Sequence, residues 1–349
     1  MQDTIVVGRS GLIEVLDTVG VDVVLDALID RLRSTIAEME PDKLLTEDRH
    51  GFHYRKPDLG LVEWMPAMDT GRRVAIKTVG YHPSNPFQRG IPSVLGTIAL
   101  YDCATGALEG IVEGTLVTAL RTGAASAVVS DVLAPSRPLV VSVVGCGAQA
   151  VTQVHALSRV RNVSRVLAHD VVADVAASFP ARLGRVIDVP VEVVPVDQQH
   201  RLLSEADVLC TATSVGIDEG PVVVGDVHKD DLHINAVGAD FAGKLELPLG
   251  LLESALVVPD VRTQCVLEGE CQQLRSDQIG PDMATLLQAP ERFRDAADGL
   301  TVFDSTGWAL EDMVAAELIL ELAREHDAAI SIDVQTVGSD PFDPYEGVA

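Results

Sequence analysis

A glycine-rich turn lies between a buried strand and a helix near the middle of the chain. The order is strand, turn and helix: Val140–Val144, then Gly145-Cys146-Gly147-Ala148-Gln149-Ala150, then Val151–Val160. In this G-x-G-x-x-A pattern Gly145 permits a tight turn, Gly147 lets a pyrophosphate approach the backbone, and Ala150 lets the helix pack on its strand. The helix N-terminus offers N–H groups to phosphates. The pattern predicts a dinucleotide site, the alternative being a structural turn in an unrelated α/β protein.

An acidic residue follows the next strand-like segment. Val163–Ala168 is followed by His169 and Asp170. A carboxylate at this position of dinucleotide-binding folds accepts a hydrogen bond from the ribose 2′-hydroxyl and repels a 2′-phosphate, so NAD is expected rather than NADP. For Asp170 the alternative is an ordinary solvated loop carboxylate. The small residues of Cys210–Val215 follow another strand at the sheet edge where such cofactors lie, unless they are only the exit from that strand.

Four charged side chains have apolar or small neighbours in the sequence. Lys77 lies in the strand-like run Val74–Val79, and Arg121 lies on an alanine-rich helix. Glu63 lies between apolar residues of a strand, and Asp240 follows a strand and a glycine at the carboxyl edge of the sheet, where ligands bind. These residues are candidates for binding a charged substrate and moving protons. Each has a structural alternative. Lys77 could be an edge lysine facing water, and Arg121 could lie on a helix surface. Glu63 could lie on a surface strand, and Asp240 could cap a helix or loop.

The elements that must position these residues divide into two kinds. A length of 349 residues predicts about two domains, and 47% apolar residues are enough for a core in each. The first part predicts an antiparallel or mixed sheet with two helices. Its strands are expected at Thr4–Val7, Leu61–Met65, Val74–Val79, Val94–Tyr101 and Ala107–Val112, and its helices at 10–20 and Asp22–Met39.

From the helix Leu116–Leu133 onward, short apolar runs alternate with helical segments, which is typical of a doubly wound parallel sheet. The strands are expected at Leu139–Val144, Val163–Ala168, Val191–Val194, Asp207–Cys210, His233–Ala236, Ala255–Val258 and Leu300–Phe303. A helix, Ala309–Arg324, and a strand, Ala329–Val334, close the chain. The fold class is therefore α/β, a Rossmann-type sheet with a second α+β domain.

Composition excludes several function classes. The net charge of −26 would repel nucleic acid and anionic membranes, so neither is an expected partner. The charged residues interrupt every apolar stretch before it reaches the length of a membrane span. Five sparse cysteines favour a reduced, cytoplasmic protein, and no Cys or His pair has the spacing of a zinc site, so no metal is expected.

Several motifs resemble the ornithine cyclodeaminase/mu-crystallin family from about residue 45 to about 325. They are Ala119-Leu120-Arg121-Thr122-Gly123-Ala124-Ala125-Ser126-Ala127, Val144–Ala150, His233–Leu247 and Phe303–Gly307. Within that family, HINAVGAD with GKLELPLGLLE, Glu268–Leu274 and the ending Asp343-Pro344-Tyr345 look most like the lysine cyclodeaminases, ammonia-lyases that supply pipecolate to secondary metabolism.

The resemblance implies a homodimer whose subunits pair a discontinuous domain for substrate binding and dimerisation, residues 1–118 and 316–349, with a Rossmann domain, residues 119–315. It also implies an NAD site. The residues that would hold the cofactor are Gly145, Gly147, Ala148, Gln149, Ala150, Asp170, Thr213, Ser214, Val215, Val237, Gly238, Ser305 and Thr306.

The resemblance further implies a diamino-acid substrate. Arg49, or Arg55 in its place, would bind the α-carboxylate together with Lys77 and Arg121, while Glu63 and Asp240 would face the amines. Oxidation at Cα makes an iminium that the distal amine attacks, ammonia leaves, and the returning hydride reduces the cyclic imine. Asp240 would act as acid/base, helped by burial, and Glu63 would deprotonate the distal amine.

The alternatives are an ornithine cyclodeaminase that makes L-proline, an NAD(P)-dependent amino-acid or opine dehydrogenase or ketimine reductase, and a non-enzymatic ligand-binding protein like mu-crystallin. One methylene in a pocket is worth about 1 to 3 kcal/mol, so the sequence leaves the choice between lysine and ornithine open.

Overall fold

The computed structural model describes residues 3–40, 42–335, 340–343 and 345–346, and the chain forms two compact units. The first takes the described residues of 1–20, 40–117 and 312–349, and the second takes residues 21–39 and 118–311. Two helices, α4 (Gly114–Leu133) and α11 (Ala309–Glu325), run through the points where the chain passes from one unit to the other. Pro344 of the predicted terminal motif lies outside the described residues.

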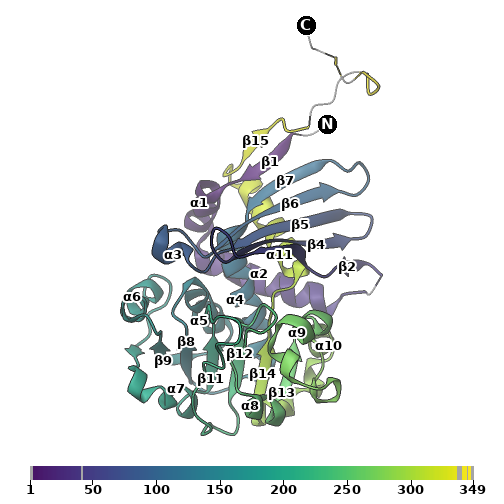
Figure 1. Ribbon diagram of the computed structural model, residues 1–349. Coiled ribbons are helices and arrows are strands. Elements are labelled where there is room, and N and C mark those ends of the chain that lie inside the picture. Colours follow the sequence, from purple (N-terminus) through teal and green to yellow (C-terminus); the bar gives the residue numbers. More distant parts are fainter. Residues whose placement is uncertain (1–2, 41, 336–339, 344, 347–349) are drawn as a thin grey trace. The chain divides into compact units, whose positions relative to one another are not determined.

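The first unit is built on an eight-stranded mixed sheet (Figure 1). Its order is β15-β1-β7-β6-β5-β4-β2, with β3 also paired to β4. Strand β1 runs parallel to β7 and antiparallel to β15. The strands are β1 (Thr4–Val7), β2 (Leu44–Thr46), β3 (His50–Tyr54), β4 (Gly60–Asp69), β5 (Arg73–Tyr81), β6 (Val94–Asp102), β7 (Leu108–Glu113) and β15 (Ile330–Ile332).

One face of this sheet is packed against α11. A side chain at Gly110 of β7 would lie 3.0 Å from Leu320, and Glu317 pairs with Arg72 and Arg73 at the start of β5. The remaining helices of the unit are α1 (Arg9–Val19) and α3 (Asn85–Gln88). The alternating burial of β4 and β5 follows from this packing, since every second side chain points toward the helix.

The second unit is built on a seven-stranded parallel sheet (Figure 1). Its strands are β8 (Leu139–Val144), β9 (Val163–His169), β10 (Val191–Val193), β11 (Val208–Thr211), β12 (His233–Ala236), β13 (Leu256–Pro259) and β14 (Thr301–Asp304). The order is β10-β9-β8-β11-β12-β14-β13, which reverses direction between β8 and β11. At that reversal the loops after neighbouring strands diverge, and dinucleotides bind there in doubly wound folds.

Two apolar layers cover the two faces of the parallel sheet. One contains Val154 and Leu157 of α5 (Ala148–Val160) and Phe179 of α6 (Ala173–Leu183). The other contains Leu202 of α7 (His200–Ser204) and Leu252 of α8 (Leu249–Ser254). The predicted fold class, a Rossmann-type sheet with a second mixed-sheet domain, is therefore confirmed.

The remaining helices of the second unit are α2 (Val21–Ala37), α9 (Arg262–Glu268) and α10 (Met283–Gln288). The sequence-based boundaries put residues 21–39 in the first domain, whereas here α2 belongs to the second unit. It contacts α10 and α5 with a buried apolar face, and ion pairs add to this contact: Asp22 pairs with His155 and Arg159 of α5, and Asp26 pairs with Arg159. An amphipathic pattern predicts that a helix packs, but not on which sheet.

Most secondary structure agrees with the expected elements within a few residues, and the exceptions are β2 and β3. No strand was expected between Met39 and Leu61, because β3 has no alternation of apolar and polar residues and is exposed along most of its length. It forms because β4 is long enough to pair with two short strands in succession. The segment 47–49 between them carries Arg49.

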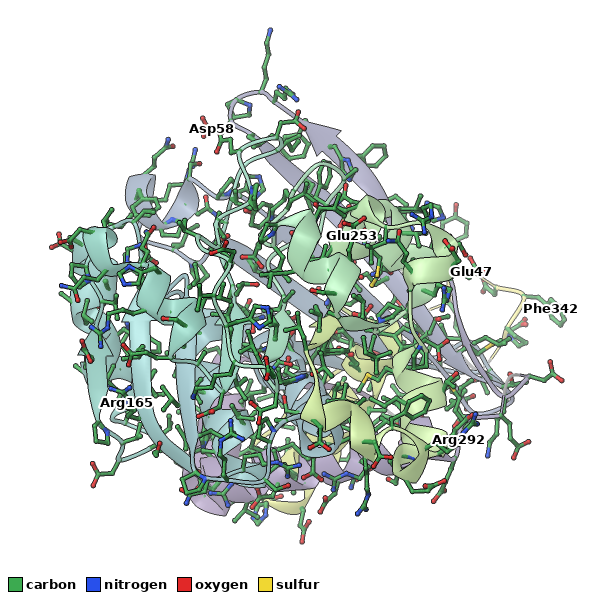
Figure 2. All side chains as sticks on the ribbon, turned by 90° about the horizontal axis from the view of Figure 1, so that it is seen from below. Glu47, Asp58, Arg165, Glu253, Arg292 and Phe342 are labelled. Atoms are coloured by element: carbon green, nitrogen blue, oxygen red, sulfur yellow. The ribbon has the colours of Figure 1, made fainter. Side chains whose placement is uncertain are left out.

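The charged residues mostly lie at the surface; Glu253 and Arg292 of the second unit, both labelled in Figure 2, are examples of exposed charged side chains. By length and composition α4 could cross a membrane, but 83% of its most apolar window is buried inside the protein, as in a core helix. Gly123 lets α4 lie against α5, since a Cβ there would be 2.5 Å from the Thr152 carbonyl oxygen. Buried charges are therefore exceptions to be explained.

Candidate functional site

The glycine turn after β8 has the geometry that its sequence requires. Gly145 has a φ of +89°, and a Cβ at this position would lie 2.7 Å from the carbonyl oxygen of Ala212 in the loop after β11. Both observations exclude any other residue, because a left-handed backbone and a close approach coincide. The Gly145 N–H donates to the carbonyl oxygen of His169, which fixes the turn against the end of β9.

Gly147 is the last residue of the turn, immediately before α5. Its backbone is extended, a Cβ there would meet no atom within 4 Å, and α5 begins at the next residue without a side-chain cap. The first N–H groups of α5 have no partner within the helix and no side-chain cap at Gly147, and the positive end of the helix dipole lies at this point. Ala150 is fully buried against the sheet. These features fit a pyrophosphate at the N-terminus of α5.

Asp170 lies at the end of β9 beside the turn. Its Oδ2 accepts a hydrogen bond from the Cys146 N–H and its Oδ1 accepts one from the Val172 N–H, both at 2.8 Å. Each carboxylate oxygen has a second lone pair, so a ribose hydroxyl can still donate to it. Arg182 of α6 donates to the Cys146 carbonyl oxygen at 2.6 Å and braces the other side of the turn. No sequence pattern indicated this role for Arg182.

The loops after β11 and β12 are joined by one buried carboxylate, Glu246. Its Oε1 accepts from the N–H and the hydroxyl of Thr213, both at 2.7 Å, and its Oε2 accepts from the Gly238 N–H at 2.9 Å. Burial raises the pKa of Glu246. Any Cβ at Gly238 would collide with this carboxylate. Glu246 therefore fixes two segments predicted to contact the cofactor, Thr213–Val215 and Val237–Gly238.

Further buried carboxyl groups hold the neighbouring loops. Asp260 accepts from the Ser305 hydroxyl at 3.0 Å and from the Gly307 N–H at 2.7 Å, and so fixes the predicted segment Ser305–Thr306. Glu270 accepts from the Glu246 N–H. Asp304 accepts from the Glu270 and Cys271 N–H groups. Among the described residues these carboxylates form no group that could hold a metal ion.

Burial also changes the protonation of this cluster. It raises the pKa of the Asp304 carboxyl to about 7, and burial together with the nearby Asp304 raises the pKa of Glu270 well above its ordinary range. Backbone N–H groups and not cations oppose these changes. Burial thus opposes ionisation of Asp304 and Glu270, two of the groups whose oxygens accept the backbone hydrogen bonds that hold these loops.

In the first unit Lys77 is buried and not an edge lysine facing water. Its side chain is 2% exposed, and its Nζ lies 2.8 Å from Oδ2 of Asp312 on α11, which is 1% exposed. Lys77 lies opposite Met65 on β4, and Glu63 lies opposite Val79 on β5. Opposite residues of antiparallel strands share a face, as do residues two apart. Lys77 and Glu63 therefore lie on the same, helix-covered face of the sheet.

Glu63 is also buried, and two groups from the preceding segment meet it. Nε2 of His53 on β3 lies 2.8 Å from Oε1, and a guanidinium nitrogen of Arg49 lies 3.8 Å from Oε2. Arg49 is largely buried while Arg55 is exposed, so of the two predicted alternatives Arg49 lies by the carboxylate. Gly51 stands directly opposite Glu63, where a Cβ would lie 2.5 Å from its Cγ. Glycine at this position makes room for the carboxylate.

In the second unit Arg121 is buried on α4 and does not lie on a helix surface. Its Nη1 donates to Oε2 of the fully buried Glu311 at 2.7 Å, and the guanidinium packs against Gly307, where a Cβ would lie 2.8 Å away. The counterions of Lys77 and Arg121, Asp312 and Glu311, are thus adjacent residues of α11.

Asp240 differs from its prediction in one respect. It follows β12 at the carboxyl edge, as expected, but its side chain is 39% exposed, so burial does not isolate it. Its Oδ1 instead accepts from the ammonium of Lys244 at 2.5 Å, and that lysine side chain is 6% exposed. The partner of Asp240 is therefore a buried cation, which the sequence reasoning overlooked although Lys244 stands four residues away.

The predicted substrate residues divide between the units. Arg49, Glu63 and Lys77 lie in the first, and Arg121 and Asp240 lie in the second. Within the second unit the predicted cofactor segments all follow strands at the carboxyl edge of the parallel sheet. The residues that sequence reasoning missed are the partners: His53, Arg182, Lys244, Glu246, Asp260, Glu311 and Asp312.

Comparison with known proteins assigns the chain to a family. The profile of the Ornithine cyclodeaminase/mu-crystallin family matches residues 10–327. The chain belongs to this family.

One relative and two solved structures show what the chain is similar to. L-lysine cyclodeaminase of Streptomyces rapamycinicus is 38% identical over 95% of this chain and 96% of its own length. A structure of a lysine cyclodeaminase, described with its recognition of L-lysine, L-ornithine and L-2,4-diaminobutyric acid, has a TM-score of 0.94 and 44% identity over 98% of this chain and 99% of that chain. An archaeal alanine dehydrogenase dimer with bound NAD has a TM-score of 0.84 and 26% identity over 95% of this chain and 100% of that chain.

Substitution of the two turn glycines by alanine separates stability from cofactor binding in this family member. Gly145→Ala puts an alanine in a left-handed backbone conformation and places its Cβ too close to the Ala212 carbonyl oxygen. We expect it to lower the free energy of unfolding by about 1–3 kcal/mol. Gly147→Ala meets no protein atom. It should leave the unfolding temperature unchanged and weaken NAD⁺ binding about tenfold or more, because the methyl group occupies the phosphate approach. Thermal unfolding and calorimetric titration measure both, and unchanged NAD⁺ affinity in Gly147→Ala would contradict this assignment.

Breaking the Lys77–Asp312 pair should destabilise the protein as well as stop turnover. Lys77→Met leaves a buried carboxylate uncompensated, which costs about 3–5 kcal/mol. Combining it with Asp312→Leu removes that charge and should restore most of the free energy of unfolding, but not activity. Urea unfolding of the single and double variants tests this, and a single variant as stable as the unmodified protein would show that the pair is not buried in solution.

The Asp304 carboxyl should make stability depend on pH. The unfolded chain ionises it near 3.8 and the folded protein near 7, so its contribution is complete below pH 3.8 and is lost as the pH rises to about 7. The loss is at most about 1.4 kcal/mol per pH unit. Asp304→Asn does not titrate, so the advantage of the unmodified protein over this variant should shrink up to about pH 7 and then level off. A difference in unfolding free energy that is constant with pH would refute the raised pKa.

Proposed function

We propose that this protein is an NAD-dependent cyclodeaminase that converts L-lysine to L-pipecolate and ammonia. The observation that carries the proposal is the shared face of Lys77 and Glu63, because it offers a buried cation for a carboxylate and a buried carboxylate for a distal amine. A monoamine substrate has no group for Glu63 to bind. The similarity to lysine cyclodeaminases at 38% and 44% identity supports the same reaction.

NAD is the cofactor of this proposal, and it supplies a reversible hydride acceptor for the substrate Cα when bound. Gly145, Gly147 and the N-terminal residues of α5, Ala148, Gln149 and Ala150, would hold its pyrophosphate, and Asp170 would accept from the ribose. The loops fixed by Glu246 and Asp260 would complete the site: Thr213, Ser214, Val215, Val237, Gly238, Ser305 and Thr306.

The cationic side chains bind the α-carboxylate in this proposal. Lys77 and Arg121 are each held in position by a carboxylate of α11, and Arg49 lies beside Glu63. Their charge-assisted hydrogen bonds orient Cα, and orientation supplies much of the rate in a reaction that closes a ring.

The acidic side chains handle protons. Glu63 takes the proton of the distal ammonium so that this nitrogen can attack the oxidised Cα. Asp240 takes and returns the proton at the α-nitrogen as ammonia leaves, and its hydrogen bond from Lys244 orients the carboxylate for this transfer. A single charged partner from the same loop, and not burial, sets the position of Asp240.

We further propose a homodimer in the cytoplasm that serves the biosynthesis of a secondary metabolite. The archaeal relative is a dimer, and Phe52 and Trp64 expose a pair of aromatic rings in edge-to-face contact on the face of the first sheet opposite Glu63, a surface that a second copy could cover. All five cysteines have free thiols, which suits a reducing compartment.

Deuterium at the Cα of L-lysine tests the reaction. If the hydride leaves Cα and returns to the same carbon, the pipecolate retains the label, ammonia forms in equal amount, and one NAD⁺ supports many turnovers without accumulating NADH. Mass spectrometry of the product and an ammonia assay measure this. NADH formed in proportion to product would indicate a dehydrogenase, and label lost to water would overturn the hydride return.

Faster turnover of ornithine to proline than of lysine to pipecolate would keep the mechanism and change the substrate. The absence of any product from either diamino acid would leave a ligand-binding protein and refute the proposed function.

A further inference from the structure

The contact between Glu63 and His53 lies within the first unit and is not explained by substrate binding alone. The Glu63 side chain is 5% exposed, whereas the His53 side chain, 2.8 Å away, is 46% exposed. His53 lies opposite Leu61 on β4, two residues from Glu63, so both side chains lie on the same face of the sheet. The pair thus links a buried carboxylate to an imidazole in contact with water.

Ring closure poses a proton problem at this carboxylate. The distal amine of a diamino acid is an ammonium ion at neutral pH and must lose a proton before it can form a bond to carbon. That proton goes to Glu63 in the proposed function. Glu63 is enclosed, with Arg49 at 3.8 Å on its other side, and the next cation on this face, Lys77, pairs with Asp312. Each turnover leaves Glu63 with a proton that must move on.

We propose that His53 carries the distal-amine proton from Glu63 to water. The nitrogen–hydrogen bond of the ammonium breaks as Glu63 takes the proton, and Nε2 of His53 then accepts it from the carboxyl group. The imidazolium releases the proton on Nδ1 to solvent, and exchange with water restores the starting tautomer. Histidine suits this step because its two nitrogens can accept and release a proton near neutral pH. This inference rests on the proposed function.

His53→Gln tests the relay, because glutamine can hydrogen-bond to Glu63 but cannot pass a proton through its side chain. With NAD⁺ and L-lysine we expect kcat to fall about tenfold or more while KM and the unfolding temperature stay the same. Oxidation at Cα precedes the blocked step. A rapid-mixing experiment should therefore show transient NADH absorbance in this variant that the unmodified enzyme does not accumulate.

A second variant, His53→Ala, leaves room for a free base. Added imidazole should restore part of its kcat, whereas a purely structural role would show no such rescue. The matched control is His50→Gln, an exposed histidine of the same strand that lies opposite Trp64 on the other face of the sheet, and it should keep the full rate.

The possible outcomes separate this inference from the proposed function. The relay is overturned if His53→Gln keeps a kcat within about twofold of normal, or if imidazole does not restore the rate of His53→Ala. Lysine turnover by the unmodified enzyme would still uphold the proposed function in either case. No pipecolate or proline from the unmodified enzyme overturns the function, whatever the variants do.

Discussion

Backbone N–H groups that have no partner in a helix or sheet determine much of this structure. The loops at the carboxyl edge of the parallel sheet carry such groups, and burying them without acceptors would cost about 1–3 kcal/mol each. Glu246, Asp260, Glu270 and Asp304 supply the acceptors. Each binds residues far apart in the sequence, and together they fix the distance between the loops that follow β11, β12 and β14. The loops of the candidate cofactor site are therefore held in place by hydrogen bonds from backbone N–H groups to buried carboxyl oxygens.

Buried cations follow a different rule. Lys77 and Arg121 each have a carboxylate from α11 within hydrogen-bonding distance, so neither is an uncompensated charge. A buried pair of this kind contributes little net stability, but losing one partner is costly. The pairs hold the amino and guanidinium groups in place before any ligand arrives, and this preorganisation is the property that a carboxylate-binding site needs.

The sequence predicted the parts of the structure that depend on local pattern. The turn Gly145–Ala150 was predicted because each position has its own steric requirement, and the strands from Leu139 onward were predicted because buried parallel strands are continuously apolar. The partners of the predicted residues were not, since Arg121 and Glu311 are 190 positions apart and Thr213 and Glu246 are 33 apart. His53 was missed for another reason. Its strand is too short and too exposed to have a periodic pattern, and it exists because β4 offers a free edge.

The position of α11, far along the chain from Lys77 and Arg121, bears on how the protein folds as it is synthesised. Translation produces Lys77 and Arg121 long before the ribosome releases Glu311 and Asp312, and β15, which pairs with β1, appears later still. Lys77 of the first unit and Arg121 of the second therefore gain their counterions only after α11 has been made. In a nascent chain that has emerged only to Gly307, Lys77 and Arg121 have no counterions from α11. Burying either cation without its counterion would be costly, so both side chains are favoured to stay in water. Folding of the first unit is thus coupled to the synthesis of α11 and β15, and not to the emergence of its N-terminal strands.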